Sequence, residues 1–523
     1  MSDGLPRSLS ALLRPAAYPH PVDAIELIRT PVSWVLLTGE FAYKLKRPVR
    51  YPFIDLTRAE RREFCCREEL RLNRRFAPQL YFDVCAITTT AGEARIGGDG
   101  TAIEYAVKMR QFRREDELDR LLASGEVAPG ELGIFGGALA GIHARLPTAA
   151  ATDPWATADQ VGRLVLENLA QCAQAADIFS DVASIEALRA PLQKRLGSLQ
   201  QCMAARRTAG RVRECHGDLH TCNVVRWRST LLAFDCMEFE PAFRWIDVAD
   251  EIAFLLADLG ARGYPDHAHS FLAGYLAASG DYQACRLLPM YQAHRALVRA
   301  KITAVSARES GPANRARQLQ EWRRLTGLAA AALTVHRPRL LLTCGTSGSG
   351  KTWLADRLAP RLRAIHLRSD VERKRRVGLP PAARLSAEPA QGVYTPESTA
   401  AVYADLLAQA EDLLAGGRDA IVDATFGRRE QRERFLERAR QMGACCLIIV
   451  CLAPVEVLHT RVAARCLAGG DASDADQAVL RWQLARHETL DAAELARAVY
   501  ANTDEPGVIE DVMRQVAHLE ASV

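Results

Sequence analysis

The pattern of hydrophobic and polar positions predicts that the chain begins with a small group of strands. From Ser33 to Lys46 the sequence predicts two strands joined by a tight turn at Gly39-Glu40. Thr57 followed by Glu60 has the spacing of a capping box, which predicts that a helix starts here. Apolar residues, among them Phe64 and Leu72, then recur at helical spacing. We therefore expect a hairpin that packs beside a helix.

The pattern then changes from strands to helices. Strand-like segments cover Leu80 to Thr88 and Ala102 to Met109. After Arg114 the periodicity is mostly helical as far as the 330s, with one short strand region from His216 to Asp235. The sequence predicts an α+β domain in which a small β lobe precedes a larger helical lobe.

A second pattern starts at Arg339, where RLLLTC predicts a buried strand. An amphipathic helix from Ala400 to Leu414 follows, and DAIVDAT and CCLIIVCLA predict further buried, parallel strands. The stretch before this pattern is basic, contains Gly and Pro, and has no catalytic signature. We place the domain boundary near 335, which gives domains 1–335 and 336–523, the second an α/β domain with a parallel sheet.

Composition excludes several classes of protein. Hydrophobic residues make up 49% of the 523 positions and charged residues 25%, as in globular proteins. No run of roughly 18 apolar residues exists, so we expect a cytoplasmic protein without a membrane partner. The net charge of +4 gives no general case for nucleic-acid binding. Two basic runs, 372–376 and 428–440, have the pattern of solvated helix faces. The 14 cysteines include no CxxC and indicate neither zinc nor disulfides.

The segment GTSGSGKT matches the P-loop pattern GxxxxGK[ST]. It follows an apolar strand and precedes a helix, which is the context that such a loop requires. Backbone amides of the loop surround phosphate oxygens, the lysine neutralises the β- and γ-phosphates, and the threonine hydroxyl ligates Mg²⁺. The predicted ATP site consists of Gly345, Thr346, Ser347, Gly348, Ser349, Gly350, Lys351 and Thr352.

Four other residues of the second domain are candidates for the same chemistry. Asp423 ends the apolar strand AIVD and is a candidate magnesium ligand, although a strand-end aspartate can also cap the next turn. Asp370 follows the expected second strand and could accept the proton of an acceptor hydroxyl, or serve as a helix N-cap. Arg461 and Arg465 share one helix face, as a pair that closes over phosphates requires; two surface arginines would give the same pattern.

The first domain contains the segment HGDLHTCN, in which Asp218 and Asn223 stand five residues apart. A third polar residue, Asp235, ends the apolar segment LLAF. An aspartate can deprotonate an acceptor hydroxyl, while an asparagine and a second aspartate hold Mg²⁺ against nucleotide phosphates. The spacing therefore indicates a phosphotransfer site, in which the two histidines, together with Asp247 and Asp250, brace the loop.

A lysine and a glutamate would complete that site. Lys44 lies in the segment AYK on the second hairpin strand and has the form of a phosphate-binding lysine, with Lys46 on the same face as a competitor. Its ion-pair partner should lie on the predicted helix, where Glu69 is our choice and Glu68 the alternative.

These motifs carry two family resemblances. From about Arg339 the chain resembles small-molecule P-loop kinases of the gluconate kinase, polynucleotide kinase and zeta-toxin type, which implies roles for Asp370, Asp423 and the two arginines, and a substrate-side loop over 378–397. The first 310 or so residues resemble the aminoglycoside phosphotransferase and choline kinase superfamily, with a protein-kinase-like fold. That resemblance implies Asp218 as the base and Asn223 and Asp235 as magnesium ligands.

The fusion resembles bacterial proteins described as aminoglycoside phosphotransferase-like and ATP-binding. We therefore predict a phosphotransferase that uses ATP and Mg²⁺, with the hydroxyl of a small molecule as acceptor. A nucleotide-responsive regulator or toxin-like switch is the alternative, and a polynucleotide 5′-hydroxyl kinase is a third interpretation. The sequence defines neither the acceptor nor the oligomeric state, and it gives no direct link to antibiotic resistance.

Overall fold

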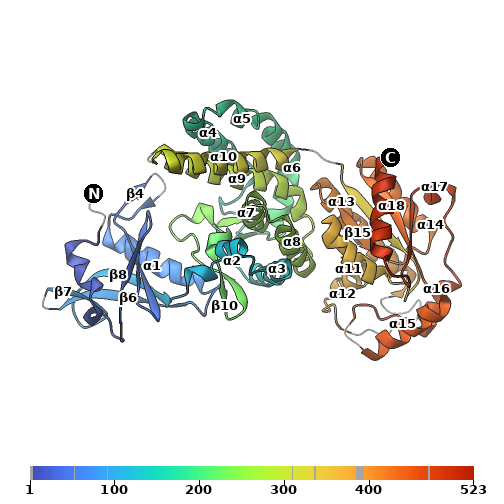
Figure 1. Cartoon of the computed structure of the whole chain (residues 1–523), viewed down its shortest axis with the longest axis horizontal. Coiled ribbons are helices and arrows are strands. Elements are labelled where there is room, and N and C mark those ends of the chain that lie inside the picture. Colours follow the sequence, from blue (N-terminus) through green and yellow to red (C-terminus); the bar gives the residue numbers. More distant parts are fainter. Residues whose placement is uncertain are drawn as a thin grey trace. The chain divides into compact units, whose positions relative to one another are not determined.

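We describe the chain from a computed structural model that covers residues 4–51, 54–90, 92–308, 310–334, 337–383, 394–468 and 471–522 (Figure 1). The chain forms two compact units, Met1–Ser279 with Tyr291–Ala330, and Gly280–Met290 with Ala331–Val523. The predicted boundary near 335 and residues 384–393 of the predicted substrate-side loop lie outside the described residues.

A six-stranded antiparallel sheet and one helix form the start of the first unit (Figure 1). The strand order is β1-β2-β3-β8-β6-β7. The elements are β1 Glu26–Arg29, β2 Ser33–Leu37, β3 Phe41–Lys46, β6 Tyr81–Thr90, β7 Glu93–Ile96, β8 Ala102–Arg110 and helix α1 Ala59–Asn73, with 3-10 helices η1 Arg7–Leu13 and η2 Pro15–Ala17 before the sheet and a short pair, β4 Arg50–Tyr51 and β5 Ile54–Asp55, before α1. The predicted hairpin is β2-β3, and its turn lies at Gly39-Glu40.

Alternation along β3 decides which side chains reach the helix. Tyr43 and Leu45 are buried in a core with Leu12 of η1. Successive side chains of a strand point to opposite faces, so Lys44 and Lys46 lie on the other face. That face packs against α1, because Ala42 shares a buried cluster with Cys66 of that helix.

The start of α1 differs from the prediction. The first helical residue is Ala59, and the side chain of its N-cap residue, Arg58, makes no capping hydrogen bond. The capping box predicted at Thr57 and Glu60 is wrong, because the hydroxyl of Thr57 instead donates to Asp55 Oδ1 at 2.6 Å. Phe64, predicted on the apolar face, is 48% exposed.

Helices and two small strand pairs complete the described part of the first unit. Strand β9 pairs with β12, and β10 pairs with β11. Trp245–Asp247 is the strand β12, and Asp247 then caps α7 by accepting from the amide of Ala249. The elements are η3 Arg114–Asp116, α2 Leu118–Ser124, α3 Pro129–His143, α4 Ala158–Ala175, η4 Ala176–Phe179, α5 Val182–Glu186, α6 Arg189–Thr208, β9 Val212–Glu214, η5 Thr221–Asn223, β10 Val224–Trp227, β11 Thr230–Ala233, η6 Pro241–Phe243, β12 Trp245–Asp247, α7 Val248–Ala261, α8 Pro265–Ser279, α9 Ala284–Arg308 and α10 Pro312–Leu333.

The second unit is built on a five-stranded parallel sheet of order β14-β15-β13-β16-β17 (Figure 1). Its central strand, β13, is buried after its first residue, which is why RLLLTC reads as a continuous apolar run. Helices α11 and α18 share one core with the sheet. The elements are β13 Arg339–Cys344, α11 Lys351–Leu362, β14 Ile365–Arg368, α12 Ser369–Arg376, α13 Pro396–Ala415, β15 Ala420–Asp423, α14 Arg429–Gln441, β16 Cys445–Leu452, α15 Val455–Ala468, α16 Gln477–Leu484, α17 Ala492–Leu495, β17 Ala498–Asn502 and α18 Val508–Ser522.

The predicted fold class is confirmed: an α+β unit with a β lobe and a helical lobe is joined to an α/β unit with a parallel sheet. Among the described residues, no helix combines the length and the apolar character needed to cross a membrane.

Candidate active sites

In the first unit, Lys44 on β3 lies against Glu69 on α1. Lys44 Nζ is 2.9 Å from Glu69 Oε1, and it also forms an ion pair with Asp235. Burial alone would lower the pKa of Lys44, but the carboxylates of Asp235 and Glu69 raise it well above its ordinary value. The structure therefore brings together the predicted lysine, its predicted partner and one predicted magnesium ligand.

The competitor Lys46 belongs to the same cluster. Its Nζ lies 2.5 Å from Glu69 Oε2, and it forms a second ion pair with Glu238. Each oxygen of Glu69 thus lies beside the ammonium group of one lysine, and the side chain of Glu69 is fully buried. Glu238 was missed in the sequence because, three residues after Asp235, it matches no motif that we considered. Two lysines and three carboxylates nearly balance in charge, as buried ions require.

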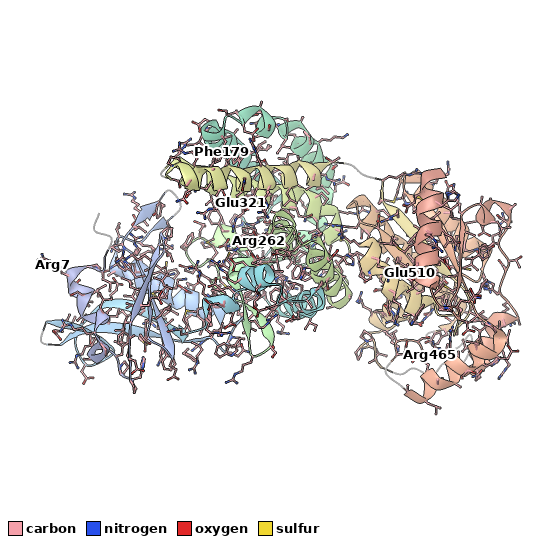
Figure 2. All side chains as sticks on the ribbon, in the orientation of Figure 1. Arg7, Phe179, Arg262, Glu321, Arg465 and Glu510 are labelled. Atoms are coloured by element: carbon pink, nitrogen blue, oxygen red, sulfur yellow. The ribbon has the colours of Figure 1, made fainter. Side chains whose placement is uncertain are left out.

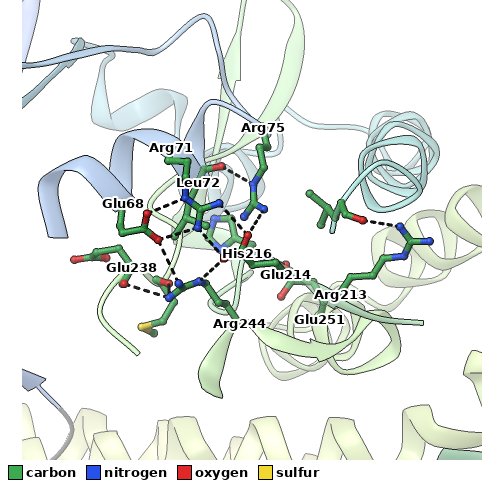
Figure 3. A network of polar contacts seen from close by, with 12 residues as sticks. Glu68, Arg71, Leu72, Arg75, Arg213, Glu214, His216, Glu238, Arg244 and Glu251 are labelled. Atoms are coloured by element: carbon green, nitrogen blue, oxygen red, sulfur yellow. Dashed lines mark hydrogen bonds and ion pairs between the residues drawn. The ribbon is translucent and has the colours of Figure 1, made fainter. Parts of the chain in front are cut away.

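Glu68, the alternative partner, points into a different network, which Figure 3 shows. It accepts from Arg71 and lies 3.3 Å from Arg244. Glu214 on β9 accepts from Arg71, Arg75 and Arg244 at 2.8 to 3.1 Å. Burial would raise the pKa of Glu214, but these guanidinium groups lower it to about 2. The network fastens α1 to the strand that leads into HGDLHTCN.

The β10-β11 hairpin sets the spacing between the other predicted residues. Val224 pairs with Ala233 at the open end of the ladder, so Asn223 and Asp235 both lie near that end. Asn223 Nδ2 donates to Asp218 Oδ2 at 3.0 Å and to the carbonyl oxygen of Asp218 at 2.9 Å. Asp235 has a φ of +65°, a conformation that non-glycine residues rarely adopt outside functional sites.

The two histidines of HGDLHTCN hold this loop. His216 lies 2.8 Å from the carbonyl oxygen of Phe234, and His220 Nε2 lies 3.5 Å from Asp218 Oδ2. Burial would raise the pKa of Asp218, but His220 lowers it to about 2. Asp218 is therefore ionised at neutral pH, as its predicted role as a base requires.

Asp247 and Asp250 do not brace the loop as predicted. Asp247 binds Arg206, and Asp250 binds Arg295. The bracing residues are Glu251, whose carboxylate accepts the amides of His216 and Gly217 at 2.7 and 3.0 Å, and Asp258, which accepts the amide and hydroxyl of Thr221 at 3.0 and 2.5 Å. Glu251 and Asp258 are seven residues apart on α7, so they share the helix face that meets the loop.

In the second unit, the predicted P-loop connects β13 to α11. Gly348 and Gly350 have φ of +82° and +85°, and a Cβ on Gly350 would approach Thr503 to within 2.8 Å. Thr352 Oγ1 donates to Asp423 Oδ2 at 2.6 Å, because β15 is the parallel neighbour of β13. A hydroxyl and a carboxylate in this arrangement are oxygen ligands of the kind that Mg²⁺ prefers.

His366 on β14 was not found by sequence reasoning. Its two ring nitrogens lie 3.0 Å from Asp356 Oδ1 and 3.3 Å from Asp423 Oδ2. Burial would raise the pKa of Asp423, but His366 lowers it to about 2, so the carboxylate is ionised and available to a cation. No sequence signal could have identified a lone histidine on an adjacent strand.

A cavity of about 320 Å³ opens from the P-loop. Lys351, Thr352 and Asp423 line it, and so does Asp370, in the first turn of α12. Burial raises the pKa of Asp370 above its ordinary value, which suits a base that operates near neutral pH. The residues predicted to hold the nucleotide phosphates and Mg²⁺ and the residue predicted to act as the base for the acceptor hydroxyl thus line one cavity.

The two arginines predicted as a pair have different surroundings. Arg465, labelled in Figure 2, lines the cavity and donates to the carbonyl oxygen of Ala475 at 2.9 Å. Arg461 is not among the residues that line it; its guanidinium donates to the hydroxyl and carbonyl oxygens of Thr503 at 2.9 and 3.0 Å. Arg461 therefore supports the P-loop from outside the cavity. Gln483 of α16, which we did not predict, accepts the amide of Ser347 at 2.7 Å.

The fold joins an α+β unit that contains the HGDLHTCN loop to an α/β unit with a parallel sheet and a P-loop. A family model described as "AAA domain" matches residues 340–490. The chain belongs to the family of "Uncharacterized protein Rv2004c" of Mycobacterium tuberculosis (strain ATCC 25618 / H37Rv), to which it is 31% identical over 462 residues, 87% of this chain and 89% of the relative.

Two solved structures are similar to parts of the chain. A sugar kinase from Janibacter sp. HTCC2649 is 18% identical, covers 35% of this chain and 95% of its own, and has a TM-score of 0.28. A choline/ethanolamine kinase family protein from Mesorhizobium loti is 12% identical, covers 61% and 94%, and has a TM-score of 0.36.

Proposed function

We propose that this protein is an ATP- and Mg²⁺-dependent phosphotransferase that acts on the hydroxyl of a small molecule. The observation that carries the proposal is the joint lining of one cavity by Lys351, Thr352, Asp423 and Asp370. These residues supply a phosphate-binding cation, two cation ligands and a base within a single site. The second site, around Asp218, supports the same class of reaction.

The reaction at the P-loop follows from these positions. The acceptor oxygen forms a bond to the γ-phosphorus, and the bond from that phosphorus to the β-γ bridging oxygen breaks, with its electron pair leaving on ADP. The hydroxyl proton passes to the carboxylate of Asp370. Thr352 and Asp423 would hold Mg²⁺, which offsets the phosphate charge when bound, and Lys351 attracts the same oxygens.

The first unit could perform the same displacement with its own residues. Asp218 would accept the proton of the acceptor, and Asn223 and Asp235 would hold Mg²⁺. Lys44, fixed by Glu69, would contact the nucleotide phosphates once they draw it from Asp235. The two sites could act in sequence on one metabolite.

The test is turnover of γ-labelled ATP by the full chain with a pool of cell metabolites, followed by mass spectrometry of new phosphorylated species. We would compare wild type with Asp218→Asn and Lys351→Ala. A product lost in only one variant assigns the chemistry to that unit, and several kcal/mol of barrier are expected from the loss of either group. If wild type and both variants formed no product although wild type bound ATP, this result would contradict the proposal and favour a regulatory switch.

A further inference from the structure

The segment 428–440 contains six arginines, and their surroundings differ. Four of them contact carboxylates: Arg429 with Glu433, Arg432 with Glu494, Arg438 with Glu411 and Arg440 with Glu437, at 2.6 to 2.9 Å. Arg428 and Arg434 form no ion pair with any residue that the structure describes. Both of these line the cavity that opens from the P-loop. Among the six arginines of 428–440, the two without an ion pair to a described residue are therefore the two that line the cavity.

A third arginine reaches the cavity from α12. The run 372–376 was predicted to be a solvated helix face, and this is wrong for its first three residues, because Glu372, Arg373 and Lys374 are buried. Lys374 is held by Asp474, and Arg373 lies over the ring of Tyr394, 4.8 Å from its centre. Arg373 is only 7% exposed and lines the cavity one helical turn after Asp370.

Positive charge therefore dominates the side of the cavity formed by α12 and α14. Of the three carboxylates that line the cavity, Asp423 contacts Thr352 at the P-loop and Asp370 is the proposed base. Glu430, an exposed residue at the start of α14, is the third. Guanidinium groups bind carboxylates and phosphates through paired, charge-assisted hydrogen bonds.

We propose that the acceptor of the P-loop site is a small hydroxyl compound that carries an anionic group, held by Arg373, Arg428 and Arg434. Because Arg373 and Asp370 are one turn apart, an anionic group at Arg373 lies close to a hydroxyl at Asp370, within reach of one small molecule. A cavity of about 320 Å³ has the size of small-ligand pockets, which favours a small molecule over a polymer. This inference rests on the proposed function of the same site.

The test separates cell metabolites by anion exchange and offers each fraction to the full chain with γ-labelled ATP. We expect the new product from the anionic fraction, and we expect Arg428→Gln and Arg434→Gln to raise the KM for the acceptor about tenfold or more while the KM for ATP stays unchanged. Arg440→Gln, on the same helix but paired with Glu437, is the matched control and should behave as wild type. Phosphatase treatment of the fraction distinguishes a phosphate from a carboxylate.

A second measurement does not depend on turnover. Phenylglyoxal modifies accessible guanidinium groups, and peptide mass spectrometry reports each arginine separately. At constant ionic strength and with MgADP present, the anionic fraction should protect Arg428 and Arg434 but not Arg440. Protection without product would support the anion site and contradict the proposed transfer. A product from the neutral fraction, or no protection by the anionic fraction, would overturn the inference.

Discussion

His220 and Asp218 form a partly buried charge pair whose titration can be measured directly. Burial would lower the pKa of His220, but Asp218 raises it to about 9. We expect a histidine titration near pH 9 in NMR spectra of labelled protein, absent in His220→Gln. In Asp218→Asn the pKa of His220 should fall toward or below 6.5, because the carboxylate that raises it is lost while burial still opposes the charged form. A midpoint that stays near 9 in Asp218→Asn would contradict this pairing.

The same pair makes stability depend on pH. The raised pKa of His220 stabilises the folded state fully below pH 6.5, and this contribution is lost as the pH rises through about 9. The lowered pKa of Asp218 stabilises the folded state above 3.8, and that contribution is lost as the pH falls through about 2. The urea midpoint of wild type should therefore exceed that of His220→Gln more at pH 6 than at pH 9.5.

Sequence reasoning found the site residues that belong to motifs and missed those that support them. The P-loop and HGDLHTCN can be read from spacing because their chemistry is local in the chain. Glu238, His366 and Gln483 act across strands or helices, and a single side chain at such a position carries no spacing signal. The choice between Glu68 and Glu69 likewise depended on which face of α1 meets β3, and adjacent helix positions point about 100° apart.

At the scale of elements, glycines decide how α3 packs on α8. A Cβ on Gly274 would lie 2.0 Å from the carbonyl oxygen of Gly133, and one on Gly136 would lie 2.2 Å from that of Phe271. We expect Gly274→Ala to destabilise the first unit by about 1–3 kcal/mol or more, because the two backbones must separate. Urea unfolding followed by circular dichroism measures this change.

Gly162 in α4 provides the matched control, since a Cβ there meets nothing within 4 Å. Gly162→Ala should leave stability unchanged or raise it by about 0.5–1 kcal/mol, because alanine favours the helix interior. Equal midpoints for Gly274→Ala and Gly162→Ala would show that the close contact does not limit stability.

The elements found from the sequence were those with strong periodicity. The β2-β3 hairpin and the strands β13, β15 and β16 are alternating or continuously apolar, and the structure has them where they were predicted. The prediction omitted several short strands, among them β7, β12 and β17. These three strands have three to five residues, and their pairing partners, rather than their own patterns, define them.

At the scale of the whole molecule, both units belong to one family. The match to the mycobacterial relative covers 87% of the chain, which exceeds either unit alone. The fusion is thus shared with that relative rather than peculiar to this chain. Under the proposed function, Lys44 in the first unit and Lys351 in the second would each contact nucleotide phosphates, which requires two separable nucleotide sites.

Equilibrium dialysis with Mg²⁺ and a non-hydrolysable ATP analogue should count these sites. We expect about two nucleotides bound per wild-type chain, and one in either Lys351→Ala or Lys44→Ala, because each lysine contacts phosphates in its own unit only. The double variant should bind none, and the control Lys194→Ala, an exposed lysine of α6, should bind two. If Lys351→Ala alone removed both nucleotides, binding in the first unit would depend on the second, and the two sites would be coupled rather than separable.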